Sequence, residues 1–188
     1  MNKLQDVDWS RIPVPEDDGK ADHLHQAMMP HVPLMVTDGR TIDLAALTGL
    51  TVVYAYPRTG RPDIPLPEEW DIIPGARGCT PQACAFRDHF AELRELNVDY
   101  LFGLSTQDTL YQQEAVERLH LPFPLLSDHE LALTKALHLP TFEVDGITLL
   151  KRITFIIETG SIRQVFYPVF PPDQNVSDVI SWLRSHRT

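Results

Sequence analysis

Apolar residues follow two different periods along the chain, and the two periods alternate. Residues 50–56 (LTVVYAY) and 98–104 (VDYLFGL) are nearly continuous runs of apolar, mainly β-branched and aromatic residues. Such runs are typical of strands that are buried on both faces of a sheet. Residues 79–97 and 106–120 instead carry apolar positions every three or four residues, which predicts helices.

The remaining segments extend this alternation. The dipeptide Asp38-Gly39 separates two apolar runs and predicts a hairpin followed by a short helical turn. Thr106 or Asp108 is expected to cap the second helix. The other predicted elements are a short strand at 123–128, a short helix at 129–139, a hairpin within 147–170 that turns at Thr159-Gly160, and an amphipathic helix at 175–186.

The order of these elements predicts the fold class. Strands and helices alternate first and a hairpin comes last, which indicates a mixed β-sheet with helices on both faces. This is an α/β, thioredoxin-like arrangement with one extra strand–helix insertion and an N-terminal hairpin. The length of 188 residues suits one core, so we expect a single domain over 30–188. Residues 1–29 are polar, acidic and punctuated by proline, which predicts an extended arm.

Charge and composition argue against several classes of function. The formal net charge is −10, and no basic stripe is present to neutralise phosphates, which argues against nucleic acid and against an anionic membrane surface. The first 26 residues lack the apolar run of a signal peptide, and no apolar stretch approaches the length of a membrane span. The sequence therefore predicts a cytoplasmic protein.

The chain has two cysteines, and both lie at the start of one predicted helix, in PGARGCTPQACAFRDH (74–89). A helical wheel places Cys79 in line with the apolar residues Ala83 and Phe86, and Cys84 about 140° away on the polar face. The helical rise puts their Cα atoms roughly 8.6 Å apart, whereas a disulfide needs less than about 7 Å. We expect a folded thiol state and a disulfide state in which the first turns are unwound.

The position of Cys79 favours a reactive sulfur. In the first turn of a helix, free backbone N–H groups and the helix dipole stabilise a negative thiolate. Arginines at 58, 61, 77 and 87 lie nearby in the sequence. A simpler interpretation is that each cysteine is a small, buried apolar side chain without reactivity. It would explain Cys79, but it does not explain Cys84 on the polar face. A zinc site is disfavoured, because no second pair of ligands follows and the two cysteines point apart.

At this point the residues resemble a known family, the peroxiredoxins, and within it the bacterioferritin-comigratory or Q-type group with a Cys-x4-Cys helix. The resemblance covers about residues 30–185. It rests on four segments in this order: GCTPQACAFRD (78–88), FGLST (102–106), PFPLLSD (122–128) and KRITFII (151–157).

The resemblance implies roles for three residues. Cys79 corresponds to the peroxidatic cysteine, whose thiolate attacks a peroxide to give a sulfenic acid. Cys84 corresponds to the resolving cysteine, which forms an intramolecular disulfide, and Arg152 to the arginine that lowers the energy of the thiolate and holds the peroxide. The implied partners are a peroxide and thioredoxin or a similar dithiol reductant, with no cofactor or metal. Assembly as a monomer or a homodimer stays open.

The chain departs from the family pattern before Cys79. The family has proline seven residues and threonine three residues before this cysteine, where this chain has Ile72 and Ala76. About fifteen extra residues also follow the strand. In one reading the insertion bulges outward and leaves Pro57 and Thr59 near the pocket; in the other, Thr80, a water or nothing takes the threonine role.

Other interpretations remain for the insertion and for the whole chain. The proline- and aromatic-rich insertion predicts either a lid or collar for a bulkier peroxide, or a surface loop packed by Trp70. The leading hypothesis is a thiol peroxidase. The alternatives are a redox sensor or disulfide-relay protein of the same fold, and a scaffold protein whose loops dock a partner.

Overall fold

The computed structural model describes residues 7–186. Its strands in the main sheet are β1 (Pro33–Val36), β2 (Thr41–Asp43), β3 (Leu50–Ala55), β4 (Tyr100–Ser105), β5 (Leu125–Ser127), β8 (Ile153–Glu158) and β9 (Ser161–Phe166). They form one sheet in the order β2-β1-β5-β4-β3-β8-β9. β3, β4 and β5 run parallel to one another, whereas β8 is antiparallel to β3 and β9 is antiparallel to β8. The prediction of a mixed sheet is confirmed.

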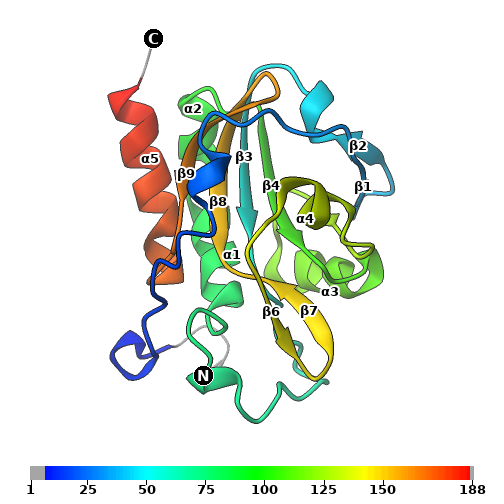
Figure 1. The fold of residues 1–188 in the computed structure, drawn as a ribbon, viewed down its shortest axis with the longest axis vertical. Coiled ribbons are helices and arrows are strands. Elements are labelled where there is room, and N and C mark those ends of the chain that lie inside the picture. Colours follow the sequence, from blue (N-terminus) through cyan, green and yellow to red (C-terminus); the bar gives the residue numbers. More distant parts are fainter. Residues whose placement is uncertain (1–6, 187–188) are drawn as a thin grey trace.

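Helices cover both faces of this sheet (Figure 1). They are α1 (Cys79–Asp88), α2 (Phe90–Glu95), α3 (Thr109–Leu119), α4 (Ala132–Leu137) and α5 (Asn175–Ser185). One core cluster joins the α1, α2, α3 and α5 side to β3 through Val52 and Tyr54, and the opposite cluster joins α4 to β3 through Val53 and Ala55. Alternate residues of β3 thus face different cores, as its continuous apolar run predicts.

The predicted helix over 79–97 is divided in two. α1 ends at Asp88 and α2 begins at Phe90, with His89 between them in a conformation (φ −103°, ψ 10°) outside the helical range. Asp108, one of the two expected caps, accepts a hydrogen bond from the backbone N–H of Tyr111 at the start of α3.

The late hairpin is shorter than predicted, because a separate two-stranded sheet precedes it. β6 (Thr141–Val144) pairs with β7 (Ile147–Leu150), while β8 and β9 turn at Thr159-Gly160 as expected. Asp145 and Gly146, both with positive φ, form the tight turn of the extra hairpin. The chain leaves β7 through Lys151 and Arg152 before it enters β8, and this break places Arg152 at the end of the sheet.

The N-terminal segment is largely extended, but it does not stand apart from the domain. Ala21, Leu24 and Met29 are buried in the same core cluster as α4, and Met28 bridges to Ser161 of β9. The expectation of a separate polar arm up to residue 29 is therefore corrected for residues 21–29, because these few apolar side chains are enough to bind the segment to the core. Residues 1–6 of that expected arm lie outside the described residues.

Candidate active site

Cys79 is the first residue of α1, at the end of the long loop that follows β3. Figure 1 shows this loop, the N-terminal segment and the β6–β7 hairpin at the same end of the molecule. Gly78 caps the helix with φ +110°, in the left-handed region, and a Cβ there would lie 2.6 Å from Trp9 Cη2 and 2.8 Å from Pro172 Cγ. Glycine is required at this position, and the helix begins with its first N–H groups free of partners within the helix.

Arg152 contacts the sulfur of Cys79. Arg152 is buried, and its Nη2 donates to Cys79 Sγ at 3.4 Å. The same nitrogen donates to the backbone carbonyls of Gly75 (3.1 Å), Ala76 (3.2 Å) and Arg77 (3.2 Å). Four acceptors around one nitrogen fix the guanidinium against the turn before α1. The Arg152 cation therefore lies in a fixed position against the sulfur.

Gln82 is a site residue that the sequence did not indicate. Its Oε1 accepts from Arg152 Nη1 at 2.6 Å, and its Nε2 donates to Asn175 Oδ1 at 3.0 Å. Thr154 donates to the same Asn175 oxygen at 2.7 Å. Residues three apart on a helix share a face, so the signal for Gln82 was its spacing from Cys79. This buried chain of hydrogen bonds ties α1, β8 and α5 to the arginine.

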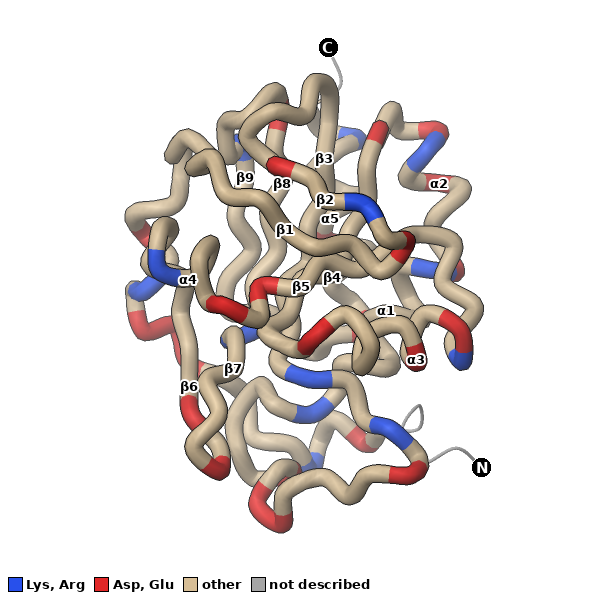
Figure 2. Tube along the Cα trace, turned by 90° about the vertical axis from the view of Figure 1, so that its right-hand side faces the viewer, with Lys and Arg blue, Asp and Glu red and all other residues tan. Residues whose placement is uncertain are grey.

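A small hollow opens on Cys79. It measures about 10 Å³, enough for about one water molecule. The residues around it are Arg58, Gly60, Leu66, Trp70, Arg77, Gly78, Cys79 and Thr80. Two of the four arginines noted in the sequence, Arg58 and Arg77, therefore reach the hollow. Figure 2 shows several basic positions at this end of the molecule, below α1 and α3, with acidic positions among them.

The two positions where the family has proline and threonine supply neither shielding nor a hydroxyl. Ile72 is exposed, and Ala76 is buried in an apolar cluster with Trp70 and Leu149. The Ala76 carbonyl accepts a long contact from Cys79 Sγ at 3.7 Å. The family's hydroxyl group is thus missing from its usual place in the sequence.

The residues expected to replace this proline and threonine differ in whether they line the hollow. Pro57 and Thr59 are buried, but the Thr59 hydroxyl donates to Gln107 Oε1 at 3.5 Å. Neither belongs to the lining of the hollow, although their neighbours Arg58 and Gly60 do. Thr80, the alternative, is buried and lines the hollow directly beside Cys79.

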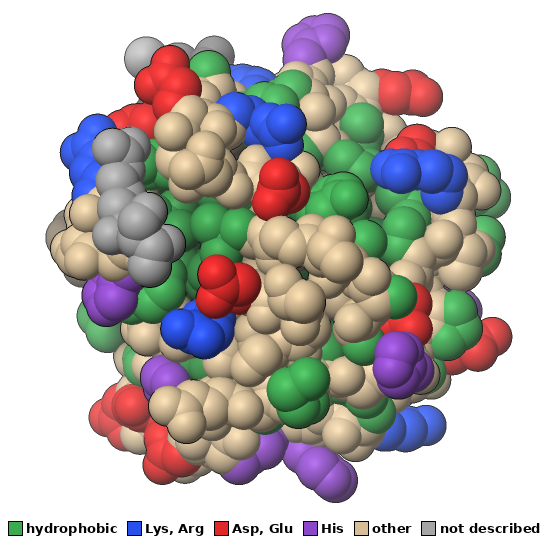
Figure 3. Space-filling model, turned by 90° about the horizontal axis from the view of Figure 1, so that it is seen from above, with side chains coloured by type: hydrophobic (Ala, Val, Ile, Leu, Met, Phe, Trp, Pro, Cys, Tyr) green, Lys and Arg blue, Asp and Glu red, His purple; other side chains and the backbone are tan. Residues whose placement is uncertain are grey.

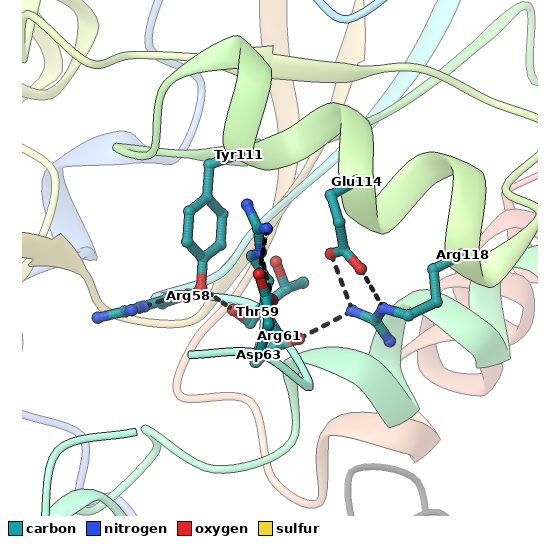
Figure 4. A network of polar contacts seen from close by, with 8 residues as sticks. Arg58, Thr59, Arg61, Asp63, Tyr111, Glu114 and Arg118 are labelled. Carbon is teal, nitrogen blue, oxygen red and sulfur yellow. Dashed lines mark hydrogen bonds and ion pairs between the residues drawn. The ribbon is translucent and has the colours of Figure 1, made fainter. Parts of the chain in front are cut away.

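The start of the insertion is tied to α3. Figure 4 shows Tyr111 pointing from α3 to this loop, where its hydroxyl accepts from Arg58 Nε at 3.1 Å and donates to the Thr59 carbonyl at 2.9 Å. Arg118 of α3 donates to the Gly60 carbonyl at 2.8 Å. Further along, Trp70 is buried against the β6–β7 hairpin, so it does pack this loop onto the surface.

Cys84 is buried, which corrects the prediction that it lies on a wet, polar face. It is 9% exposed and belongs to the same core cluster as Cys79. On this side α1 lies against the end of α3, where Arg87 Nη1 donates to the Leu119 carbonyl at 2.9 Å. The charged residues that made the face look polar lie at its rim. Neither cysteine is in a disulfide, and α1 is intact.

Three groups near the cysteines have shifted pKa values, and one of them is Tyr56, whose pKa is raised by burial and by Cys79. Burial raises the pKa of Tyr54, and the neighbouring Tyr56, Cys79 and Cys84 raise it further. The pKa of Arg87 is raised by its hydrogen bond with Asp88 and by the nearby Cys84. The tyrosines therefore stay neutral beneath the sulfurs, while a permanent cation lies beside Cys84.

Other kinds of site find no support in residues 7–186. This part of the chain holds no group of three or more His, Cys, Asp or Glu residues placed to bind a metal ion. None of its helices combines the length and the apolar character needed to cross a bilayer. The end of the molecule opposite Cys79 mixes apolar, acidic, basic and histidine side chains without one dominant charge (Figure 3).

Comparison with known proteins places this geometry in a family. The Redoxin family model matches residues 22–181. Peroxiredoxin Bcp of Escherichia coli is 30% identical over 154 residues, which are 79% of this chain and 88% of that protein. The chloroplastic peroxiredoxin Q of Oryza sativa subsp. japonica is 29% identical over 158 residues, 83% of this chain; the chain spans only 64% of that relative's length.

Solved structures share the fold. Peroxidoxin BcpB of Mycobacterium tuberculosis superposes with a TM-score of 0.71 at 24% identity, over 87% of this chain and 98% of that one. Peroxiredoxin Q of Xanthomonas campestris gives a TM-score of 0.65 at 22% identity, over 82% and 90%. With the family match and the Bcp relative, these findings identify the chain as a member of the redoxin family and, within it, a peroxiredoxin of the bacterioferritin-comigratory, or Q, type.

Proposed function

We propose that this chain is a thiol-dependent peroxidase that reduces hydrogen peroxide or organic hydroperoxides. The observation that carries the proposal is the buried Arg152 Nη2 at 3.4 Å from Cys79 Sγ, at the start of α1. A sulfur placed between a fixed guanidinium and free helix N–H groups is activated as a nucleophile.

The reaction has two chemical steps in this chain. The Cys79 thiolate attacks the terminal peroxide oxygen; an S–O bond forms, the O–O bond breaks, and the leaving oxygen takes a proton and departs as water or an alcohol. The thiolate of Cys84 then attacks the sulfenic sulfur, so that a disulfide forms and water leaves. Thioredoxin or a similar dithiol protein returns both cysteines to thiols by exchange.

The other site residues differ in how directly they are expected to contact the peroxide. Arg152 donates toward the sulfur, so it is positioned to hold the peroxide oxygens in line with it. Thr80 lines the hollow and is the better candidate for the missing hydroxyl. Pro57 and Thr59 are proposed to close the floor behind Arg58 and Gly60 rather than to bind the peroxide.

We propose a cytoplasmic location, because a cysteine pair that must return to thiols after each turnover needs a compartment that keeps thiols reduced. A redox sensor or disulfide relay is the second candidate, and Ala76 in place of threonine is the observation that favours it. A relay would react slowly with peroxide but exchange readily with a protein disulfide.

Peroxide consumption with a thioredoxin system tests the proposal. Cys79→Ser should abolish turnover, while Cys84→Ser should complete one turnover and then stall. Mass spectrometry of the oxidised wild-type protein should find a Cys79–Cys84 disulfide. Wild-type turnover in the Cys79→Ser variant would refute the assignment, and rapid disulfide exchange with negligible peroxide consumption would favour the relay.

A further inference from the structure

Arg58 is a half-buried arginine that lines the hollow at Cys79, and its charge has no acidic partner in the described part of the chain. Its outer nitrogens, Nη1 and Nη2, donate no hydrogen bond to any of residues 7–186. Arg77, the second arginine at the hollow, instead forms an ion pair with Asp71 at 2.9 Å. A guanidinium that has lost part of its water usually has carboxylate or carbonyl partners, so the free donors of Arg58 indicate a ligand.

Tyr111 of α3 holds the Arg58 side chain in place. The Tyr111 hydroxyl accepts from Arg58 Nε at 3.1 Å, and Arg58 Cζ lies 5.4 Å from the centre of the tyrosine ring. The same hydroxyl donates to the Thr59 carbonyl at 2.9 Å, so it fixes the backbone beside Arg58 as well. Figure 4 shows the outer nitrogens of Arg58 beyond the Tyr111 hydroxyl, on the side away from Glu114. Nε is therefore engaged by the tyrosine, while the outer nitrogens stay available to a ligand.

Peroxide reduction develops negative charge on an oxygen that is not bonded to the sulfur. When the Cys79 thiolate forms an S–O bond with one peroxide oxygen, the electron pair of the O–O bond stays on the other oxygen. Arg152 contacts the sulfur itself at 3.4 Å, but it does not line the hollow, whereas Arg58 does. Donors that are already held in position where charge develops lower the energy of the transition state.

We propose that Arg58 is a further catalytic residue, whose outer nitrogens donate to the leaving oxygen of hydrogen peroxide as this oxygen acquires negative charge. The Cys79 thiolate supplies the electron pair of the new S–O bond, and the leaving oxygen departs with the pair of the broken O–O bond. It then takes back from the solvent the proton that Cys79 released on ionising, which gives water, while Arg58 keeps its own protons. Tyr111 is the positioning residue for Arg58. This inference rests on the proposed peroxidase function and adds a charged donor to it, whereas the hydroxyl proposed for Thr80 is neutral.

Arg58→Met tests the role of the guanidinium, and Arg61→Met is the matched control. Arg61 also lies 5.4 Å from the centre of the Tyr111 ring, but it pairs with Asp63 at 2.7 Å and does not line the hollow. Each substitution removes one positive charge from the insertion. Stopped-flow tryptophan fluorescence gives the rate constant for Cys79 oxidation by hydrogen peroxide over a series of pH values. On the alkaline plateau, where the thiol is fully ionised, this constant should fall about tenfold or more in Arg58→Met and stay unchanged in Arg61→Met.

Alkylation of Cys79 separates an effect on the leaving oxygen from an effect on the thiol. Iodoacetamide reacts with the same thiolate but releases iodide, which gains little from a hydrogen-bond donor. The ratio of the peroxide rate constant to the alkylation rate constant should therefore fall about tenfold in Arg58→Met. A wild-type plateau in this variant, or an equal loss in both reactions, would overturn the proposal, because Arg58 would then not act on the leaving oxygen.

Tyr111→Phe tests the positioning role, since it keeps the ring but removes the hydroxyl that engages Arg58 Nε. The plateau rate constant should fall by a smaller factor than in Arg58→Met. In the Arg58→Met background the same substitution should cause no further loss, because both changes act on one contact. Additive losses would show that Tyr111 acts independently of Arg58 and would overturn its positioning role.

The same measurements distinguish a failure of this inference from a failure of the peroxidase assignment. If the wild-type protein consumed peroxide and Arg58→Met matched it, the peroxidase function would stand and the role of Arg58 would be overturned. If the wild-type protein did not react with peroxide while iodoacetamide still alkylated Cys79, the peroxidase function would fail, and the catalytic role of Arg58 would fail with it.

Discussion

Gln82 Oε1 accepts a hydrogen bond from Arg152 Nη1 at 2.6 Å, and this contact joins the helix that carries both cysteines to the cation beside Cys79. Gln82 lies between the two cysteines in sequence. Bringing Cys84 to Cys79 requires these turns of α1 to unwind, which removes Gln82 from both Arg152 and Asn175. The activated thiol and the disulfide therefore require two different arrangements of the same residue.

Arg152→Lys should slow the reaction of Cys79 with hydrogen peroxide by about 10²–10³-fold, the usual cost of losing an oriented donor at a reacting centre. Lysine keeps the charge, but it cannot reach Gln82, the sulfur and the loop carbonyls together. Stopped-flow tryptophan fluorescence measures the rate constant. Arg163→Lys, at an exposed arginine of β9 paired with Glu158, is the control. Equal rates for the two variants would contradict the role of Arg152.

Substitutions at Gln82 should separate positioning from simple packing. Gln82→Met removes the oxygen that receives Arg152, and we expect the rate of Cys79 oxidation to fall about tenfold or more. Gln82→Glu retains that oxygen, so it should hold Arg152 in place and lose less of the rate than Gln82→Met. Because its carboxylate partly offsets the arginine charge beside Cys79, the pH profile of the reaction should move in Gln82→Glu, whereas Gln82→Met should lower the rate across the pH range. Identical profiles and rates in both variants would show that Gln82 only fills space.

Gly78→Ala should destabilise the protein in two ways. Left-handed backbone at φ +110° strains alanine, and its Cβ would press on Trp9, so we expect a loss of about 1–3 kcal/mol in urea unfolding. Gly39→Ala is the matched control, since Gly39 also has positive φ (+88°) but a Cβ there meets nothing within 4 Å. In a Trp9→Ala background the cost of Gly78→Ala should fall, while the close approach to Pro172 Cγ keeps it above that of Gly39→Ala. An unchanged cost would exclude the clash.

Asp18 should make stability sensitive to acid. Burial acts to raise the pKa of Asp18, but hydrogen bonds from Lys151 and Tyr167 outweigh it and hold the pKa well below its ordinary value of 3.8. A carboxyl whose pKa is lower in the folded state stabilises the fold above pH 3.8, and that stabilisation is lost as the pH falls below this value.

Urea unfolding at a series of pH values measures this effect. The wild-type protein should lose stability more steeply below about pH 4 than Asp18→Asn does. Asp17→Asn removes the same charge at the adjacent position and should follow the wild-type slope. Parallel curves for wild type and Asp18→Asn would show that this carboxyl is not linked to folding.

The parts of the fold that the sequence predicted are those set by local pattern. β3 and β4 are continuous apolar runs, and the hairpin at Thr159-Gly160 has a clear turn signal. The sequence pattern does not predict the β6–β7 hairpin, although Asp145-Gly146 is a strong turn signal, because the apolar residues that follow form one nearly continuous run. The burial of Cys84 could not be predicted from a helical wheel, since it depends on where the distant end of α3 packs.

The residues of the candidate site likewise fall into two groups, those marked by a sequence motif and those whose role depends on long-range packing. Cys79 and its neighbour Arg152 were expected through the family motif, and the structure brings them together. Gln82 and Trp70 carry no motif, and their contacts involve residues far away in the chain, such as Asn175 and Leu149. Only the folded molecule shows that both lie close to Cys79.

The packing of Trp9 on Gly78 has a practical consequence for handling this protein. Trp9 Nε1 donates to Asp173 Oδ2 at 3.0 Å, so the N-terminal segment meets the turn before α5 over the first turn of α1. A purification tag or fluorescent fusion attached at the N-terminal end is thereby brought close to the reactive sulfur, whereas α5 carries the C-terminal end to the far end of the molecule (Figure 1). Kinetic work would best use protein from which such additions have been cleaved, and Trp9 itself offers an intrinsic optical reporter of that turn.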